Sequence, residues 1–264
     1  MKIRNTEFDL KNRTYVMGIL NVTPDSFSDG GLHNSVDAAV AHALKMTEEG
    51  ADIIDIGGES TRPGFEKVSE EEELRRVIPV IKKLREVSDI VISADTTKSA
   101  VAKAAADAGA DIINTVEGVG ATPEMFEAVR ESGAVFVMTY EKSYVNQFGE
   151  ALEAMAQKAI DAGIPADRII VDPGVGFGKT HEENLRVISD LPMMTQIRYP
   201  VLLGCSRKSV IGNVLNTEPG DRLAGTIVTT ALATLAGVAI VRVHDVLENV
   251  RSVRMLEAIC NSKK

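Results

Sequence analysis

Two stretches share one pattern, Glu49-Gly50-Ala51-Asp52-Ile53-Ile54 and Ala108-Gly109-Ala110-Asp111-Ile112-Ile113. In both, a run with helical spacing ends just before a glycine. A small residue and then an apolar run follow the glycine. Looser copies occur at 132–137 and 236–241. A glycine just after a helix supplies the left-handed residue that ends it, and an apolar, β-branched run fits a strand buried on both faces of a sheet. The repeats therefore predict helices that alternate with buried parallel strands.

This alternation extends along the whole chain. Strands are expected at 15–20, 51–56, 90–94, 112–113, 135–137, 168–171, 200–203 and 240–243. Helices are expected at 36–49, 70–87, 98–108, 123–131, 150–162, 181–190, 222–236 and 246–259. Strict alternation indicates a parallel sheet, and eight such units in roughly 250 residues match a closed barrel. The predicted fold is therefore α/β, a (β/α)8 TIM barrel in a single domain over 1–264. An open doubly wound sheet is the alternative.

The composition is that of an ordinary globular protein, with 44% hydrophobic and 25% charged residues and a net charge of −9. Such a charge argues against a general nucleic-acid binder, whereas a few cations in one cleft can still attract a small anionic substrate. No window approaches the roughly 20 apolar residues of a membrane span, and residues 1–7 lack the apolar core of a signal peptide. Cys205 and Cys260, the only cysteines, are typical of reduced cytosolic thiols. We expect a cytoplasmic protein without a nucleic-acid or membrane partner.

Polar residues follow every predicted strand, where a barrel carries its active site. The polar loop 21–31, with Pro24 and the paired glycines Gly30 and Gly31, suits a mobile loop that closes on a small ligand. The polar side chains expected at the strand ends are Asn21, Ser60, Thr61, Arg62, Asp95, Asn114, Thr139, Asp172, Ser206, Arg207, Lys208, Ser209, Arg242 and His244. Together they predict a site that binds a flat heterocycle and an anion.

The chemistry of these residues divides into three groups. Asp95, Asn114 and Asp172 suit an amino-pyrimidinone edge, because a buried carboxylate pairs well with an N–H and an amino group side by side. Asn21 has an oxygen that can ligate Mg2+, which prefers oxygen ligands and binds largely through substrate phosphates. The side chains that can hold phosphate or pyrophosphate are Arg62, Lys208, Arg242 and His244, with the hydroxyl groups of Ser60, Thr61, Ser206 and Ser209.

Purely structural roles compete with these assignments. Asp95 or Asp172 can be a helix N-cap, His244 can cap the last helix, and Met138 can belong to the core or touch a ligand ring. Residues 174–180, Gly-Val-Gly-Phe-Gly-Lys-Thr, look like a P-loop. That motif needs a glycine five positions before the Gly-Lys pair, where this chain has Pro173, so we exclude nucleotide triphosphate binding.

Four longer motifs resemble the signatures of the dihydropteroate synthase family. They are 18–31 (GILNVTPDSFSDGG), 55–64 (DIGGESTRPG), 172–179 (DPGVGFGK) and 206–209 (SRKS), with Arg242-Val243-His244-Asp245 matching as well. The resemblance covers nearly the whole chain. It implies a barrel that joins p-aminobenzoate to 6-hydroxymethyl-7,8-dihydropterin pyrophosphate, giving 7,8-dihydropteroate and pyrophosphate in folate synthesis with the help of Mg2+. It also implies a homodimer in which sulfonamides compete with p-aminobenzoate.

The resemblance further implies a role for each matching residue. The residues implied to bind the pterin are Asp95, Asn114, Met138, Asp172, Phe177, Lys208 and Arg242. Those implied for p-aminobenzoate are Thr61, Arg62, Pro63, Phe177, Lys208 and Ser209. Those implied for pyrophosphate are Asn21, Thr61, Arg242 and His244, with Asn21 as the metal ligand. The implied catalytic set is Asn21, Lys208, Arg242 and His244.

Two departures from the family pattern leave alternatives open. The family commonly has Asn-Asp where this chain has Asn114-Thr115, and Met-His where it has Met138-Thr139. These changes motivate a second hypothesis, a pterin-binding paralogue without synthase activity. A third is a methyltetrahydrofolate-dependent methyltransferase, which shares the pterin barrel but gives no reason for the motifs at 60–64 and 206–209.

Overall fold

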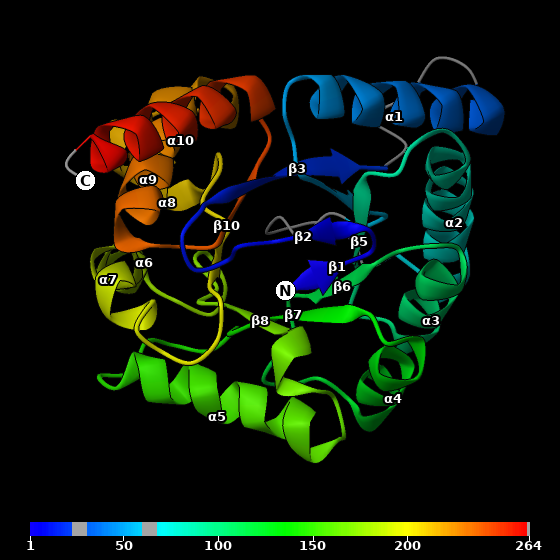
Figure 1. Ribbon diagram of the computed structural model, residues 1–264, viewed down its shortest axis with the longest axis horizontal. Helices are drawn as coiled ribbons and strands as arrows, with labels where there is room; N and C mark the ends of the chain where they lie inside the picture. The colour runs from blue at the N-terminus through cyan, green and yellow to red at the C-terminus, as the bar shows by residue number, and fades with distance from the viewer. Residues whose placement is uncertain (23–30, 60–67, 263–264) are drawn as a thin grey trace.

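The computed structural model describes residues 1–22, 31–59 and 68–262, and of 31–34 only the backbone. In these residues, eight parallel strands form a central barrel and ten helices surround it (Figure 1). The barrel strands are β3 (Tyr15–Asn21), β4 (Ile53–Gly57), β5 (Val91–Asp95), β6 (Ile112–Thr115), β7 (Val135–Thr139), β8 (Ile169–Asp172), β9 (Leu202–Leu203) and β10 (Ile240–Val243). The helices are α1 (Gly31–Glu48), α2 (Glu70–Val87), α3 (Ser99–Asp107), α4 (Pro123–Ser132), α5 (Phe148–Asp161), α6 (His181–Ser189), α7 (Leu191–Met194), α8 (Ser209–Leu215), α9 (Leu223–Ala236) and α10 (Val246–Asn261).

The strands form one sheet in the order β8-β7-β6-β5-β4-β3-β10-β9. A parallel bridge between Val171 and Val201 joins the two outer edges, and the amide of Val171 donates to the carbonyl oxygen of Pro200 at 3.0 Å. The sheet therefore closes on itself, which confirms the predicted barrel over the open doubly wound sheet.

The glycines of the repeated pattern have the predicted conformation. Gly50, Gly109, Gly133 and Gly237 follow α1, α3, α4 and α9 with φ of 103°, 111°, 69° and 82°. A side chain is strained in this left-handed region, whereas glycine enters it freely. Each repeat therefore ends a helix and turns the chain into the next strand.

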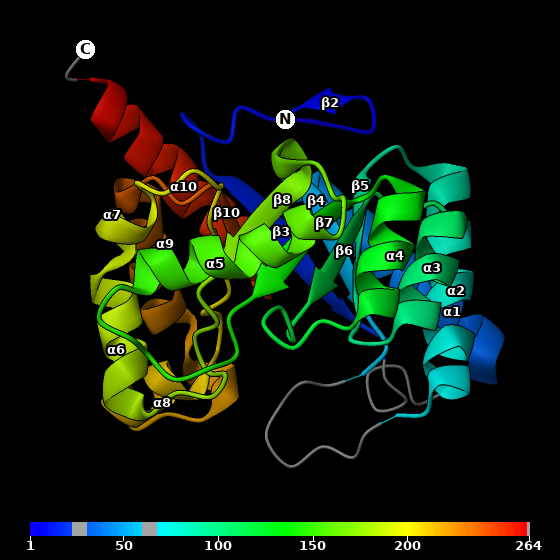
Figure 2. The same cartoon turned by 90° about the horizontal axis from the view of Figure 1, so that it is seen from below.

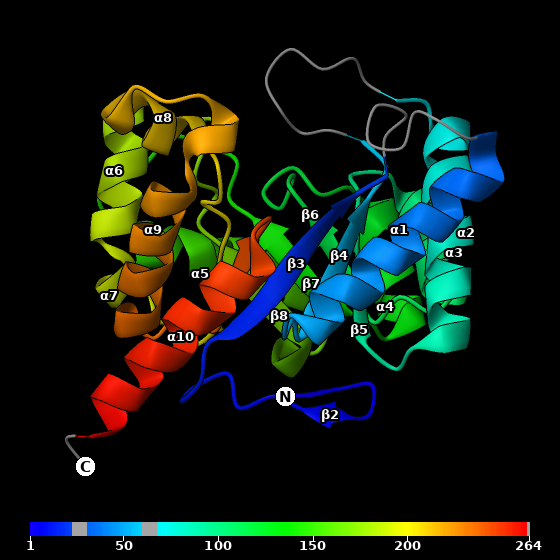
Figure 3. The same cartoon turned by 90° about the horizontal axis from the view of Figure 1, so that it is seen from above.

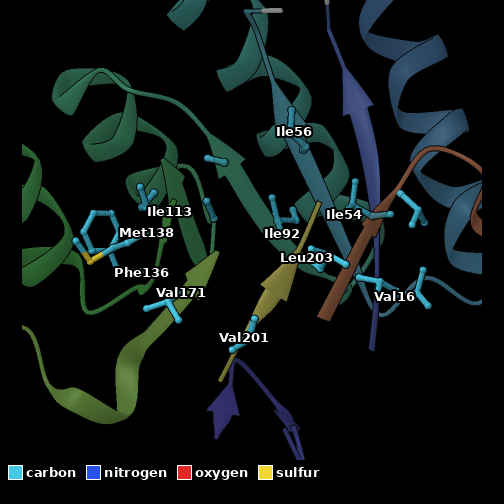
Figure 4. Packing of buried hydrophobic residues seen from close by; sticks show 14 of the residues in the cluster. Val16, Ile54, Ile56, Ile92, Ile113, Phe136, Met138, Val171, Val201 and Leu203 are labelled. Carbon is cyan, nitrogen blue, oxygen red and sulfur yellow. The ribbon is translucent and has the colours of Figure 1, made fainter. Parts of the chain in front are cut away.

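The strands bury two apolar layers, one on each face. Residues on the outer face pack against the surrounding helices, as Val16, Ile54, Ile92, Phe136 and Met138 do (Figure 4). Residues on the inner face fill the barrel from its amino-terminal end. They are Tyr15, Met17, Ile53, Val91, Ile112, Val135, Val137, Ile170, Leu202 and Ile240.

A short hairpin, β1 (Lys2–Ile3) and β2 (Thr6–Glu7), lies across the amino-terminal end of the barrel (Figure 2). Ile3, Phe8 and Leu10 from this segment are buried against the inner apolar layer. The Phe8 and Tyr15 rings lie 4.6 Å apart between centroids. The hairpin thus closes that end, and the opposite end carries the loops that lead into the helices.

Two smaller expectations can also be compared with the structure. Cys205 is buried, Cys260 is exposed, and both thiols are free, as predicted for reduced cysteines. No helix in the described parts of the chain is long and apolar enough to cross a membrane.

Candidate active site

Inward-facing positions change from apolar to polar along the strands. Side chains alternate between the two faces of a strand, so the positions that follow Ile53, Val91, Ile112, Ile170 and Ile240 by two residues also face the barrel interior. The polar side chains at these positions, with the next inward position of the strand 91–95 included, are Asp55, Ser93, Asp95, Asn114, Asp172 and Arg242. The barrel therefore holds a polar cluster at its carboxyl-terminal end.

Arg242 lies at the centre of this cluster. Its Nε donates to Asp55 Oδ2 at 2.6 Å, and its Nη2 donates to Asp95 Oδ2 at 2.6 Å. Asn114 Nδ2 reaches both carboxylate oxygens of Asp55 at 3.4 Å. Asp55 is fully buried, so the guanidinium supplies the charge that makes this burial tolerable.

The second half of the cluster lies around Asp172 and Lys208. Asp172 Oδ1 accepts a hydrogen bond from the Gly174 amide at 2.7 Å. A side-chain carbon at Gly204 would lie 3.6 Å from Asp172 Oδ2, 3.8 Å from Lys208 Nζ and 4.0 Å from Arg242 Cδ. Asp172, Lys208 and Arg242 therefore converge on one space above Gly204.

Phe177 forms one wall beside Lys208. Lys208 Nζ lies 4.3 Å from the centroid of the Phe177 ring and donates to the Val175 carbonyl oxygen at 2.5 Å. The ring and the aliphatic part of the lysine offer apolar faces, while the ammonium points at polar atoms. This wall suits a flat ring with polar edges.

Burial perturbs the titration of these groups. It raises the pKa of Asp95 to about 7, against the opposing effect of Arg242 and with a further increase from Asp55. Burial also raises the pKa of Asp172, although Lys208 opposes it, and it lowers the pKa of Lys208, which Asp172 partly offsets. Burial acts against the charge of Arg242, but Asp55 and Asp95 outweigh it and raise the pKa of this side chain. Strongly perturbed groups gathered in a cleft are typical of a functional site.

A cleft of about 240 Å³ opens from the cluster toward solvent. The residues that line it are Ile19, Asn21, Gly176, Phe177, Gly204, Ser206, Arg207, Lys208, Ser209, Pro219, Arg222, Arg242 and His244. Ser206 Oγ accepts from the His244 amide at 3.1 Å and lies 3.0 Å from its Nδ1. Asn21, Ser206 and His244 thus form the outer, hydrogen-bonding part of the cleft.

The loop between β9 and α8 is held by contacts that sequence analysis missed. Arg207 has a φ of 58°, the left-handed region that non-glycine residues rarely adopt. Its guanidinium pairs with both carboxylate oxygens of Asp245, its amide donates to Thr226 Oγ1 at 3.1 Å, and its carbonyl accepts from Arg222 at 2.9 Å. These contacts stabilise the backbone that presents Lys208 and Ser209.

The structure brings most of the expected residues to one place. Asp95, Asn114, Asp172 and Arg242 share the inner cluster, and Asn21, Phe177, Lys208, Ser209 and His244 line the cleft beside it. Thr61, Arg62 and Pro63, expected at p-aminobenzoate, lie outside the described residues.

Met138, which the family resemblance assigns to the pterin, does not face the inner cluster in the structure. Met138 is fully buried in the outer layer between β7 and the helices, because it faces the same way as Phe136, whose ring packs against that of Phe126 in α4. The neighbouring Thr139 takes the inward position and pairs in register with Asp172. Thr115 pairs with Met138 in register, two residues beyond the outward Ile113. Of the two departures, only Thr139 is therefore on the cluster's face.

The capping alternatives also fail. Helix α3 has Lys98 at its N-cap position without a side-chain cap, and α10 has Asp245 there, so neither Asp95 nor His244 caps a helix. Asp55, in contrast, was missed as a site residue. The sequence could have indicated it, because Asp55 interrupts the apolar run Ile53-Ile54-Asp55-Ile56. A carboxylate in a buried strand costs free energy unless it is paired, so it indicates a partner inside the barrel.

The donors available for a metal ion are sparse. No group of three or more His, Cys, Asp or Glu side chains able to hold a metal occurs within residues 1–22, 35–59 and 68–262. Asn21 offers one amide oxygen at the rim of the cleft. Such a donor set fits a Mg2+ ion whose other ligands are water and substrate phosphate oxygens, and does not fit a tightly held structural metal.

Comparison with known proteins gives one consistent result. Residues 17–244 match the family described as pterin binding enzyme. A dihydropteroate synthase of Clostridium beijerinckii is 46% identical, covering 98% of this chain and 99% of the relative. The structure of the synthase from Clostridium difficile, solved in the presence of pteroic acid, is 48% identical with a TM-score of 0.90 over 96% of this chain and 99% of that one. The Yersinia pestis synthase in complex with a sulfonamide drug is 39% identical with a TM-score of 0.90 over 99% of both chains.

Proposed function

The chain belongs to the dihydropteroate synthase family of pterin-binding enzymes, and from this premise we propose that its cleft joins p-aminobenzoate to 6-hydroxymethyl-7,8-dihydropterin pyrophosphate. The products are 7,8-dihydropteroate and pyrophosphate. The observation that carries the proposal is the convergence of Asp172, Lys208 and Arg242 above Gly204. Asp95 and Asn114 lie beside them in the inner cluster.

The inner cluster suits the pterin. Asp95 and Asp172 offer carboxylate acceptors to the ring N–H and amino donors, and Asn114 supplies both a donor and an acceptor. Charge-assisted hydrogen bonds of this kind are shorter and stronger than neutral ones. Phe177 gives the ring an apolar face next to Lys208. These side chains together support recognition of a flat amino-pyrimidinone.

The outer part of the cleft suits the leaving group. Arg242, His244, Ser206 and Asn21 line it together, and cations or hydrogen-bond donors aimed at a departing pyrophosphate stabilise the charge that develops there. Magnesium, when bound through Asn21 and the phosphate oxygens, would neutralise part of the same charge. The residues present fit this ion, and its presence belongs to the proposal.

The reaction needs orientation more than a protein nucleophile. As the C–O bond to pyrophosphate breaks, the electron-rich pterin ring stabilises the cation left on the methylene carbon. The aniline nitrogen of p-aminobenzoate then forms the C–N bond and loses a proton. Holding the two reactants in line converts a bimolecular step into an effectively unimolecular one. We assign the orientation of p-aminobenzoate to Phe177, Lys208 and Ser209, which line the cleft. The family resemblance adds Thr61, Arg62 and Pro63.

A homodimer is part of the same proposal. Helix α9 exposes Val228, Leu232 and Leu235, and the neighbouring α10 exposes Met255 and Ile259. The three side chains on α9 are spaced by four and three residues and so lie on one face of the helix. A contiguous exposed apolar patch is typical of an interaction surface, and a second copy of this chain is the occupant we propose. Sedimentation should give a dimer that Leu232→Glu converts to a monomer.

The test of the reaction measures pyrophosphate release by the purified protein with dihydropterin pyrophosphate and Mg2+, with and without p-aminobenzoate. We expect release that depends on p-aminobenzoate, with dihydropteroate as product, and loss of turnover in Lys208→Ala. Lys103→Ala, which removes an exposed lysine paired with Glu131, is the matched control and should retain full activity. Tight pterin binding without turnover by the unaltered protein would instead identify a non-catalytic paralogue, with Thr139 the first position to examine.

A further inference from the structure

One half-buried cation near the site has no part in the reaction as described above. The ammonium group of Lys179 donates to three carbonyl oxygens, those of Tyr140 at 2.7 Å, Gly174 at 3.1 Å and Phe177 at 3.1 Å. A lysine has three N–H donors and no acceptor, so every donor is satisfied by backbone. The ammonium of the P-loop-like run 174–180 therefore points at the backbone of its own chain, whereas the lysine of a P-loop reaches a phosphate.

The three carbonyl groups belong to two loops that touch closely. Gly174 and Gly178 have φ of 72° and 62°. A side-chain carbon at Gly174 would lie 2.2 Å from the Tyr140 carbonyl oxygen, and one at Gly178 would lie 2.1 Å from that of Glu141. The loop after β8 thus lies directly on the backbone after β7, with the Lys179 ammonium bonded to both.

Aromatic rings complete the environment of this ammonium. Lys179 Nζ lies 5.3 Å from the centroid of Tyr140 and 5.5 Å from that of Phe148, within the range of cation–π attraction. Burial lowers the pKa of Lys179 to about 8. The other charged groups that face it are Asp172, Glu141 and Glu183, which favour the charged form, and Lys208, which opposes it.

The loop held by Lys179 is the one that shapes the site. Its Val175 carbonyl accepts from Lys208 Nζ at 2.5 Å, and its Phe177 ring lies 4.3 Å from the same atom. Asn184 Oδ1 anchors the loop on the side of α6 by accepting from the Gly176 amide at 2.6 Å. Lys179 supplies the anchor on the opposite side, toward β7.

We propose that Lys179 is a positioning residue for ligand binding, which fixes residues 174–178 so that Val175 and Phe177 meet Lys208. The proposal rests on the proposed function, because the site that it organises is the pterin and p-aminobenzoate cleft. Lys179 itself does not touch the reacting atoms. Its effect passes through backbone carbonyl groups and depends on the charge of the ammonium.

The main test compares Lys179→Met with Lys158→Met. Methionine keeps most of the length and removes the charge and all three donors. Lys158 donates a single bond to the Val119 carbonyl in a neighbouring loop at 3.0 Å, so its replacement controls for the loss of an ordinary lysine–backbone contact. We expect amide hydrogen exchange in 174–178 to become about tenfold faster in Lys179→Met, as for the loss of a charged hydrogen-bond set, and to stay unchanged in Lys158→Met.

Kinetics supply the second readout. We expect KM for dihydropterin pyrophosphate to rise about tenfold in Lys179→Met, with a smaller change in kcat. The ratio of wild-type to variant kcat/KM should be largest below pH 8 and fall above it, because the wild-type ammonium then loses its proton. Taking the ratio removes any alkaline decline contributed by Lys208 in both proteins. Lys179→Arg, which keeps the charge, should retain part of the activity, and the ratio of its kcat/KM to that of Lys179→Met should stay constant as the pH rises through 8.

The outcomes separate this inference from the proposed function. Hydrogen exchange and calorimetric binding of pteroic acid need no turnover, so they test the role of Lys179 even in a protein that proves inactive. If Lys179→Met does not fold, the same measurements on Lys179→Arg decide the question through a partial loss. The inference would be overturned if Lys179→Met had the same exchange rates and the same KM as Lys158→Met. The ratio of wild-type to Lys179→Met kcat/KM would then also be independent of pH.

Discussion

The two ends of the barrel interior are built from the same strands and differ in almost every other respect. At the amino-terminal end, the inward side chains are Met17, Ile53 and Ile240, and Phe8, which directly follows the hairpin, packs over them. Two positions further along β4 and β10, the inward side chains are Asp55 and Arg242. The apolar side chains at the first end contribute only through packing, whereas the charged side chains at the second end must be paired with opposite charges. One strand register thus serves stability at one end and chemistry at the other.

The energetic consequences of the two ends have opposite signs. Burying apolar side chains contributes roughly 25 cal/mol for each Å² removed from water. Burying Asp55 and Asp95 costs free energy that the pairing with Arg242 must offset. The amino-terminal end should therefore respond to substitution through the free energy of unfolding alone, whereas the carboxyl-terminal end should also respond through ligand affinity and rate.

The largest effect is expected for Arg242→Met. Two buried carboxylates lose their cation and the leaving group loses a donor, so we expect kcat/KM to fall about 1000-fold and the free energy of unfolding to fall by about 3–5 kcal/mol. Arg85→Met is the matched control. Arg85 is paired with Asp111 at 2.6 Å away from the cleft, and its loss should lower stability while leaving the kcat/KM of the folded protein intact. A comparable loss of activity in both variants would contradict the division between the two ends.

Phe8→Ala tests the sealed end. Truncation of a fully buried aromatic ring should lower the free energy of unfolding by about 3–5 kcal/mol, measured by urea titration. At a temperature where the variant is folded, KM for both substrates should remain within about twofold, because a site far from the packing defect is energetically independent. A large change in KM would mean that the hairpin also shapes the site.

Met138 and Thr139 allow the same comparison across one strand. Met138→Ala should lower the free energy of unfolding by about 2–5 kcal/mol and leave the affinity for pteroic acid unchanged. Thr139→Val should change that affinity by roughly tenfold or less with little effect on the melting temperature. Calorimetric titration and thermal melting of both variants check the pair. If only Met138→Ala altered the affinity for pteroic acid, Met138 would have to contact the pterin.

The last prediction concerns pH, where the effect at any one pH near 7 is small. Burial raises the pKa of Asp95 to about 7 from its ordinary value of 3.8, so between these values the folded protein holds a proton that the unfolded chain releases. The contribution of Asp95 to stability is therefore fully present below pH 3.8 and is lost as the pH rises through 7. Pterin binding should change in the opposite direction and weaken by up to about tenfold per pH unit below 7, because the protonated carboxyl loses an acceptor. Asp95→Asn should remove both dependences, and a slope that persists in this variant would assign it to another group.

Most of the fold was predictable because its signals are local. Glycine and apolar runs at 49–54 and 108–113 define each helix end and strand within six residues. The rule that sites follow barrel strands then located Asp95, Asn114, Asp172 and Arg242 at the site. Asp55 was missed because it lies inside a strand, where that rule does not look.

Two features were not predictable, for physical reasons. The faces of Met138 and Thr139 were open because a shift of one residue along a strand moves every side chain to the other face, and sequence motifs do not specify the face. The support of Lys208 by Arg207, Asp245 and Lys179 was not predictable, since Arg207 and Asp245 are 38 residues apart in the chain. Such contacts depend on where the barrel brings its loops together.

The direction of the last helix has a practical consequence. Helices of this barrel run back against the strands, so α10 ends at Asn261 on the side that holds the β1–β2 hairpin and the amino terminus, away from α8 (Figure 3). A reporter protein, affinity tag or surface linkage joined at either terminus would emerge behind the barrel. The protein could therefore be immobilised or fused without screening the mouth through which its substrates enter.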